Sequence, residues 1–258
     1  MSAEQFQFAI LWPALAAGLL VTATHVPLGI QVLNRGIVFI DLAVAQIAGL
    51  GVILADRLGF EPRGAAVQVA ALAAALAGSL LLNWSERRWP EVQEAVIGVI
   101  FVLAATGATL ALASNPHGAE HLKDLLVGQI LWVDAISLWF PALGYAVVLG
   151  LWFGAGSRLG RAGFYVLFAC AVTVSVQLVG LYLVFATLIV PALATRRLAR
   201  RRLAAAYALS AVGYATGLAL SLATDLPPGP MIVWTLTALG VALFALVPPR
   251  AERAPPAV

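Results

Sequence analysis

The sequence predicts an all-α integral membrane protein, a polytopic bundle of about nine (eight to nine) transmembrane helices, and three observations support this fold class. Hydrophobic residues make up 62% of the 258 positions and charged residues only 10%, whereas a soluble domain carries about 25% charged residues. Apolar runs that are long enough to cross a hydrocarbon core recur along the whole chain. Most of the arginines lie between these runs, as the topology of a membrane protein requires.

The apolar runs define the expected helices. They cover residues 8–33, 36–55, 64–84, 95–114, 135–153, 164–194, 203–223 and 231–247. A single helix over the sixth run would be about 46 Å long, which is too long for a hydrocarbon core of about 30 Å. We therefore expect two shortened helices that turn near Gly180, with neighbouring protein satisfying the freed backbone groups. Gly213 and Gly217 form a small-xxx-small pair and predict close helix packing.

Basic residues determine the predicted orientation. If Arg35 is cytoplasmic, the alternation of helices places all 15 Lys and Arg residues in the cytoplasm except Arg57, Arg63 and Lys123. By the positive-inside rule, the N-terminus is then outside and the C-terminus cytoplasmic, in an inner membrane of bacterial type. Residues 1–247 form one transmembrane domain in this interpretation, and residues 248–258 form a short disordered cytoplasmic tail. Because the arginines serve topology and anionic lipid, no nucleic acid partner is expected.

Polar residues inside the apolar runs are candidate functional residues. An ionised carboxylate in hydrocarbon costs at least about 2.5–3.5 kcal/mol, so Asp41 should face the bundle interior or a water-filled path. Two interpretations stay open: a ligand on such a path, with Gln46 as a neutral partner, or a helix cap near the interface. For His25, we expect a neutral imidazole to satisfy the backbone carbonyl that Pro27 leaves without a donor.

A second polar cluster lies between the fourth and fifth runs and contains His117, Glu120, His121 and Asp124. If this segment is helical, the four side chains fall on one face. Imidazole and carboxylate are ligands that zinc and manganese accept. The alternative is an ordinary solvated loop or helix cap, because polar loops often hold such residues.

The sequence also excludes a class of enzyme and a kind of cross-link. A P-loop needs Gly-Lys followed by Ser or Thr, but the single lysine, Lys123, is followed by Asp124. The chain is therefore not expected to hydrolyse ATP through a P-loop. Cys170 is the only cysteine, so an intramolecular disulfide is impossible.

Four segments, taken in order, resemble a known family. VGLYLVFATLIVPALATR over residues 179–196 is similar to a signature of zinc/manganese-type ABC importer permeases, and RGIVFIDLAVAQ over residues 35–46 resembles their second helix. DLPPG over residues 225–229 resembles the turn before their last helix, and EAVIG over residues 94–98 the start of their fourth. Each motif alone is short, but together they run along nearly the whole chain.

The resemblance implies a non-enzymatic membrane subunit that imports a divalent transition metal, with zinc ahead of manganese and iron. Such a permease works as a homodimer with a separate cytoplasmic ATPase and receives its ion from an extracytoplasmic metal-binding protein. No tightly bound cofactor is implied beyond the transported ion. An ion-coupled secondary transporter without an ATPase is the alternative function. A non-transporting membrane scaffold is a third, which has no use for Asp41.

Roles for individual residues follow from the sequence and from the resemblance. From the residues themselves, we hypothesise that Asp41 is a transient ligand on the translocation route, with Gln46 as a weaker neutral partner and His117, Glu120 and His121 as collectors at the entrance. One departure concerns Ala45, which stands where the family has a histidine. An apolar helix is expected to leave the membrane at Pro191 and continue into a coupling helix that seats in the ATPase. The expected coupling residues are Pro191, Leu193, Arg196, Arg197 and Leu198.

Overall fold

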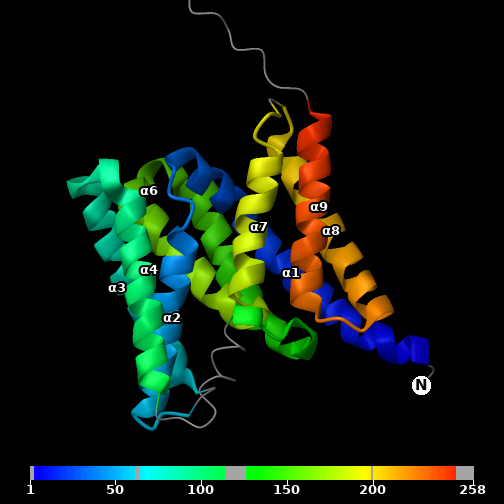
Figure 1. Cartoon of the computed structure of the whole chain (residues 1–258), viewed down its shortest axis with the longest axis horizontal. Coiled ribbons are helices and arrows are strands. Elements are labelled where there is room, and N and C mark those ends of the chain that lie inside the picture. The colour runs from blue at the N-terminus through cyan, green and yellow to red at the C-terminus, as the bar shows by residue number, and fades with distance from the viewer. Residues whose placement is uncertain (1–2, 62–63, 114–125, 199, 248–258) are drawn as a thin grey trace, which may run out of the picture.

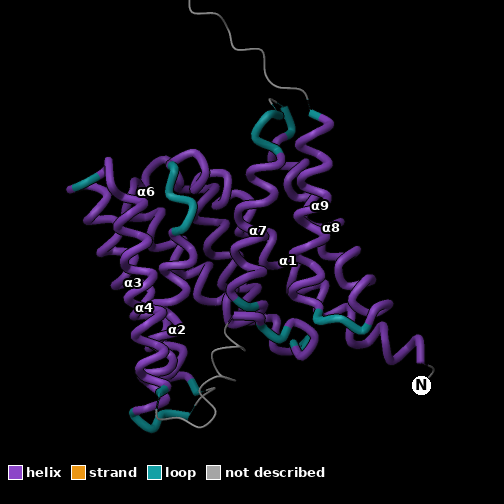
Figure 2. Tube along the Cα trace, viewed as in Figure 1, coloured by secondary structure: helices purple, strands orange, loops and turns teal. Residues whose placement is uncertain are grey.

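The described part of the chain is built from helices. The computed structural model describes residues 3–61, 64–113, 126–198 and 200–247, and within them it contains no strand (Figure 2). The predicted all-α class is therefore confirmed. The main helices are α1 (Ala3–Arg35), α2 (Ile40–Arg57), α3 (Ala65–Arg88), α4 (Gln93–Leu112), α6 (Trp139–Val179), α7 (Leu181–Ala194), α8 (Arg202–Thr224) and α9 (Pro228–Leu246). Three single-turn 3-10 helices accompany them: η1 (Pro90–Val92), η2 (Ile130–Trp132) and η3 (Ile136–Leu138).

Seven helices in the described residues are long and apolar enough to span a membrane. They are Leu11–Arg35, Ala65–Arg88, Pro90–Leu112, Ile136–Ala155, Arg158–Val179, Arg202–Thr224 and Pro228–Leu246. Two further helices lie among them: α7 has 14 residues, and α2 has 18 residues that include Asp41, Asp56 and Arg57. The predicted membrane helix bundle is confirmed, but its count of eight to nine crossings is reached only when α2 and α7 are included.

Two glycines divide the long helical stretch between Trp139 and Ala194. Gly180 has φ 85° and ψ 160°, a conformation that side chains disfavour, and it separates α6 from α7 at the predicted position. Gly160, with φ 60° and ψ −160°, interrupts α6 near the start of the span Arg158–Val179. Residues 154–163, which separate the fifth and sixth apolar runs, therefore contain a sharp break in a helix.

The helices form two groups that α6 connects (Figure 1). In one group, α2 packs against α3 and α4; in the other, α1 and α9 pack against α7 and α8, while α6 contacts α1, α2 and α3. The α1–α2, α3–α4 and α7–α8 loops lie at the upper end of Figure 1, where α9 also ends. The start of α1 and the α2–α3 and α8–α9 loops lie at the opposite end, which is the alternation that the predicted topology requires.

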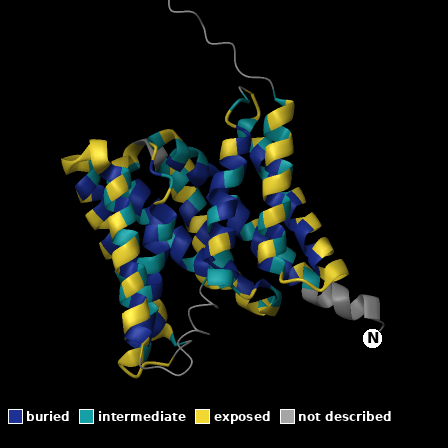
Figure 3. Ribbon diagram, viewed as in Figure 1, coloured by how far each residue is buried: buried dark blue, intermediate teal, exposed yellow. Residues whose placement is uncertain are grey.

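The interior contains small and aromatic side chains, and the outer faces are apolar. The glycine pair of α8 packs as predicted, since a Cβ at Gly217 would lie 2.5 Å from the Cα of Ile232 in α9. Many residues of α4 and α9 are coloured as exposed in Figure 3. Large apolar side chains are among them, such as Leu110 of α4, 75% exposed, and Leu246 of α9, 81% exposed. Large apolar side chains on the outside of a protein suit lipid or a partner and not water.

The partner of the carbonyl that Pro27 leaves free differs from the expectation. That carbonyl belongs to Ala23, one helical turn before the proline, and it accepts a hydrogen bond from the Tyr207 hydroxyl of α8 at 2.8 Å. The His25 Nδ1 instead lies 3.0 Å from the carbonyl oxygen of Val21. The expectation for His25 is therefore wrong, because Tyr207 of α8, and not His25, donates the hydrogen bond to the Ala23 carbonyl.

Candidate transport site

Asp41 occupies the first turn of α2, and its side chain is completely buried. Neither carboxylate oxygen has a hydrogen-bond partner among the described residues. The start of a helix supplies a partial positive charge that favours an acidic group, but a buried carboxylate without donors remains costly. A bound cation or a bound proton would satisfy these oxygens.

The side of α2 that carries Asp41 is lined by small and aliphatic residues. Val44, Ala45 and Ala48 follow it at spacings of three, four and seven residues, and all three are buried. Ala45, which stands where the resembling family has histidine, is 3% exposed. A methyl group offers no lone pair, so α2 presents one potential ligand on this side, the carboxylate of Asp41.

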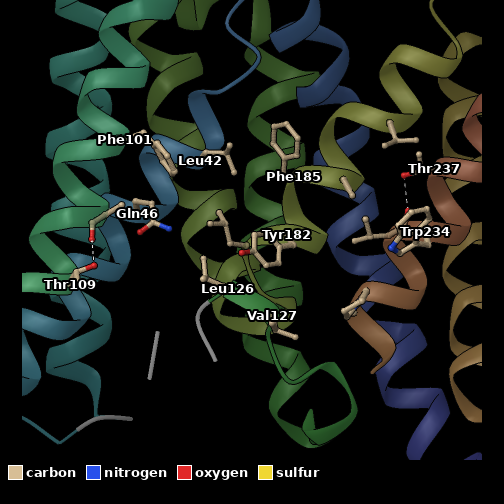
Figure 4. A pocket seen from close by; sticks show the side chains of 17 residues that line it. Leu42, Gln46, Phe101, Thr109, Leu126, Val127, Tyr182, Phe185, Trp234 and Thr237 are labelled. Atoms are coloured by element: carbon tan, nitrogen blue, oxygen red, sulfur yellow. Dashed lines mark hydrogen bonds between the residues drawn. The ribbon is translucent and has the colours of Figure 1, made fainter. Parts of the chain in front are cut away.

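A pocket of about 700 Å³ lies between α2 and α4 on one side and α7 and α9 on the other (Figure 4). Its polar lining side chains are Gln46, Thr109, Tyr182, Trp234 and Thr237, and the rest of the wall is apolar. Gln46 points into the pocket from α2, and Tyr182 faces it from α7 (Figure 4). Thr109 and Thr237 donate to carbonyls of their own helices, so the Gln46 amide and the Tyr182 hydroxyl are the polar groups best placed for a solute.

Asp41 and Gln46 do not share this pocket. Gln46 lines it together with Leu42, whereas Asp41 is absent from the lining and fully buried. Five helical positions correspond to about 500° of rotation, so the two side chains point about 140° apart. In this conformation, α2 turns the amide toward the pocket and the carboxylate away from it.

The remaining predicted metal ligands, His117, Glu120 and His121, lie outside the described residues. Within the described residues, no group of three or more His, Cys, Asp or Glu side chains is close enough to hold a metal ion. A site formed by described residues would therefore rest on Asp41 with neutral partners.

The start of α2 is joined to α4 and α7 by a group that we name the clasp, consisting of Phe39, Phe185 and Glu94. The rings of Phe39 and Phe185 stack with centroids 6.3 Å apart and planes 5° apart. The Phe39 backbone N–H donates to Glu94 Oε1 of α4 at 3.2 Å. The sequence motif at Glu94 marked the start of a helix, and only the fold reveals that this carboxylate holds the start of a different one.

The predicted coupling segment forms a tight turn between α7 and α8. Pro191 lies inside α7, which continues to Ala194, and the Pro191 carbonyl accepts a hydrogen bond from the Thr195 hydroxyl at 2.7 Å. The described residues between α7 and α8 form turns, and Arg201 has a left-handed φ of 58°. The coupling helix that the resemblance implied is thus absent from the described residues, because the link is short and ends in a helix-breaking conformation.

The arginines of this segment differ in their contacts. Arg197 donates to the carbonyl oxygens of Phe244 and Val247, at 3.1 and 3.0 Å, and its guanidinium lies over the Phe244 ring. It therefore caps the last turn of α9, whose carbonyls have no intrahelical donors. Arg202 donates to the Ala192 carbonyl of α7 at 3.1 Å. Arg196 and Arg200 are exposed.

An apolar surface accompanies these arginines. Leu193 is 41% exposed and lines a hollow of about 360 Å³ between α7 and α9, together with Val190 and Phe244. Leu198 is half-buried in the turn. The segment thus presents exposed apolar and basic side chains next to each other at one end of the bundle.

Sequence comparison identifies the family of this chain. The model of the ABC 3 transport family matches residues 7–155 and 153–247. The chain belongs to the ABC 3 transport family. The predicted resemblance to ABC permeases is thereby confirmed.

Individual relatives of this ABC 3 family protein agree with that assignment. It is 26% identical over 250 residues to the high-affinity zinc uptake system membrane protein ZnuB of Haemophilus influenzae, covering 88% of this chain and 93% of ZnuB. It is 28% identical over 253 residues to an uncharacterized membrane protein of Synechocystis, covering 89% and 88%. A chain in the structure of PsaBC from Streptococcus pneumoniae in complex with Fab superposes with a TM-score of 0.76 over 96% of this chain and 97% of that one, at 19% identity. It has the same fold.

Proposed function

We propose that this chain is the membrane-spanning permease subunit of an ABC importer that moves a divalent transition metal into the cytoplasm, with zinc ahead of manganese and iron. The observation that carries the proposal is the buried Asp41 carboxylate without a hydrogen-bond donor in α2 of an ABC 3 family protein. The name of its relative ZnuB supports zinc. The transported ion is the substrate, and no resident cofactor is required.

The partners follow from the family and from the shape of the pocket. A cytoplasmic ATPase supplies the energy, and an extracytoplasmic metal-binding protein delivers the ion. The pocket between α2, α4, α7 and α9 is lined mostly by apolar side chains, and in the proposed homodimer a second copy of the chain would complete its wall. Residues 1–247 form the single permease domain in this proposal, and residues 248–258 form its cytoplasmic tail.

Asp41 acts in the proposed mechanism as a transient ligand. A carboxylate without an imidazole partner binds borderline metals less tightly than a carboxylate with one. Weak binding suits transport, since a site on a path must release its ion as well as accept it. His117, Glu120 and His121 would collect the ion at the outer entrance. The described residues that line the pocket include no charged side chain, so they would not trap the ion on the way.

ATP-dependent metal uptake is the direct test of this function. The chain, co-expressed with the ATPase subunit of the proposed importer and reconstituted in proteoliposomes, is expected to take up radioactive zinc, with manganese competing more weakly. Replacing the P-loop lysine of that ATPase should abolish uptake, because the permease has no P-loop of its own. Uptake that persists after this lysine is replaced, but is abolished by an ionophore, would overturn the proposal and support an ion-coupled carrier.

The proposed orientation predicts which ends of the bundle face the cytoplasm. Single cysteines would replace Arg88 and Arg200 at one end and Glu61 and Asp225 at the other, all exposed positions, in a chain without Cys170. An impermeant thiol reagent added to intact cells is expected to label positions 61 and 225 only. Permeabilised cells provide the control in which all four positions react. Labelling of 88 and 200 in intact cells would reverse the orientation.

A further inference from the structure

We propose that the clasp of Phe39, Phe185 and Glu94 locks α2 in the orientation that hides Asp41, and that parting α2 from α7 releases the lock and turns Asp41 toward the pocket. This inference rests on the proposed function in that Asp41 is the ion ligand. It adds a gate to that function and assigns a role to Phe39, which directly precedes α2, to Glu94 of α4 and to Phe185 of α7.

The stacked rings lie beside a small contact between two helices. α2 packs extensively against α3 and α4 but only slightly against α7. Phe39 directly precedes α2, so its stack on Phe185 adds to this small contact between the two helix groups. Breaking it leaves the group of α1, α7, α8 and α9 intact, whereas the turn of α2 repacks its side chains against α3 and α4.

Space for the movement exists on both sides of the stack. Phe185 lines the pocket of about 700 Å³, and Phe39, which is 48% exposed, lines a second hollow of about 630 Å³ between α2 and α4. Leu42 and Phe101 line both hollows, so the two are adjacent. The Phe39 ring can leave Phe185 without displacing a packed core side chain.

Glu94 links the stack to the orientation of α2. Its Oε1 accepts the backbone N–H of Phe39, two residues before Asp41, while its Oε2 has no hydrogen-bond partner among the described residues. Turning the first turn of α2 about its axis would displace both this N–H and the Phe39 ring. The hydrogen bond and the stack therefore oppose the same movement.

The size of the required turn follows from helix geometry. Leu42 and Gln46 line the pocket, and Asp41 and Ala45 precede them by one residue each. One residue corresponds to about 100° of rotation. A turn of roughly this size would replace Leu42 and Gln46 in the pocket wall by Asp41 and Ala45.

Cysteine accessibility in the complete transporter tests the inference without depending on metal. In a chain with Cys170→Ala, Ala45→Cys reports on the hidden side of α2, and Gln46→Cys reports on the open pocket. Phe39→Ala or Phe185→Ala is expected to raise the labelling rate of Ala45→Cys roughly two- to tenfold, the range that loss of one aromatic pair produces. The rate at Gln46→Cys should stay unchanged. Phe101→Ala, which removes an equally large ring from the same hollows, is the matched control and should leave both rates unchanged.

Two further comparisons make the result specific to the clasp. Phe39→Ala and Phe185→Ala break the same contact, so the double variant should label no faster than either single variant. Glu94→Ala should also raise the rate, whereas Glu94→Gln, which keeps an acceptor oxygen, should restore it. Unchanged labelling of Ala45→Cys in both phenylalanine variants, or additive effects in the double variant, would overturn the clasp. If the phenylalanine variants label faster at Ala45→Cys but the wild-type transporter moves no metal, the clasp is supported and the proposed function is refuted.

Discussion

Replacing Asp41 by asparagine is expected to lower metal uptake by more than about a hundredfold, because loss of an outer partner of a metal ligand alone costs about 10–100-fold. Asparagine has nearly the same volume, so packing at this fully buried position is retained while the charge is lost. The measurement is zinc uptake by vesicles that contain matched amounts of inserted protein and ATPase.

The thermal stability of the Asp41→Asn variant distinguishes a transport defect from a folding defect. The Asp41 carboxylate is buried without donors, so its removal should leave the thermal unfolding temperature of the metal-free protein unchanged or higher. Asp56→Asn, at the other end of α2, is the matched control and should transport normally. Wild-type uptake in the Asp41→Asn variant would instead support the helix-cap interpretation.

Changing Leu193 and Leu198 to aspartate is expected to separate the permease from its ATPase and to stop uptake. Central apolar residues of an interface often contribute at least about 2 kcal/mol each, roughly a thirtyfold change in affinity. Leu193 is exposed next to Arg196, in the position such a contact requires. Co-purification of the ATPase and ATP-driven uptake would be measured together.

A matched change at the other end of the bundle is the control. Leu226→Asp also places a carboxylate at an exposed leucine, but in the α8–α9 loop, and should leave ATPase binding intact. Arg200→Gln should weaken assembly only modestly and in a salt-dependent way, as expected for an exposed charge. If the leucine variants retained both the ATPase and uptake, the segment would serve as a lipid anchor.

The helices could be predicted from the sequence because hydropathy and chain length act locally. Gly180 was predictable as well, since residues 164–194 exceed one membrane thickness. The break at Gly160 resembled a loop in the sequence, because glycines and arginines lower the hydropathy there while the helices on both sides continue almost to the break. A hydropathy value averaged over about 20 residues cannot show which single glycine adopts a non-helical conformation.

The site was only partly predictable, because its decisive contacts join distant parts of the chain. Asp41 stood out as a charge in an apolar run, whereas the clasp between Phe39 and Phe185 depends on how two helices cross. The five arginines near Pro191 looked equivalent as a charge cluster. The fold distinguishes them, because Arg197 donates to the carbonyl oxygens at the end of α9. Arg196 lies over the Phe244 ring, and Arg202 donates to α7.

The hydrogen bonds of Arg197 tie the α7–α8 turn to the last turn of α9. Arg202 joins the start of α8 back to α7. Both α7 and α9 line the pocket. In the proposed transporter, a displacement of the α7–α8 turn by an ATPase would therefore be passed to two of the helices that form the pocket wall.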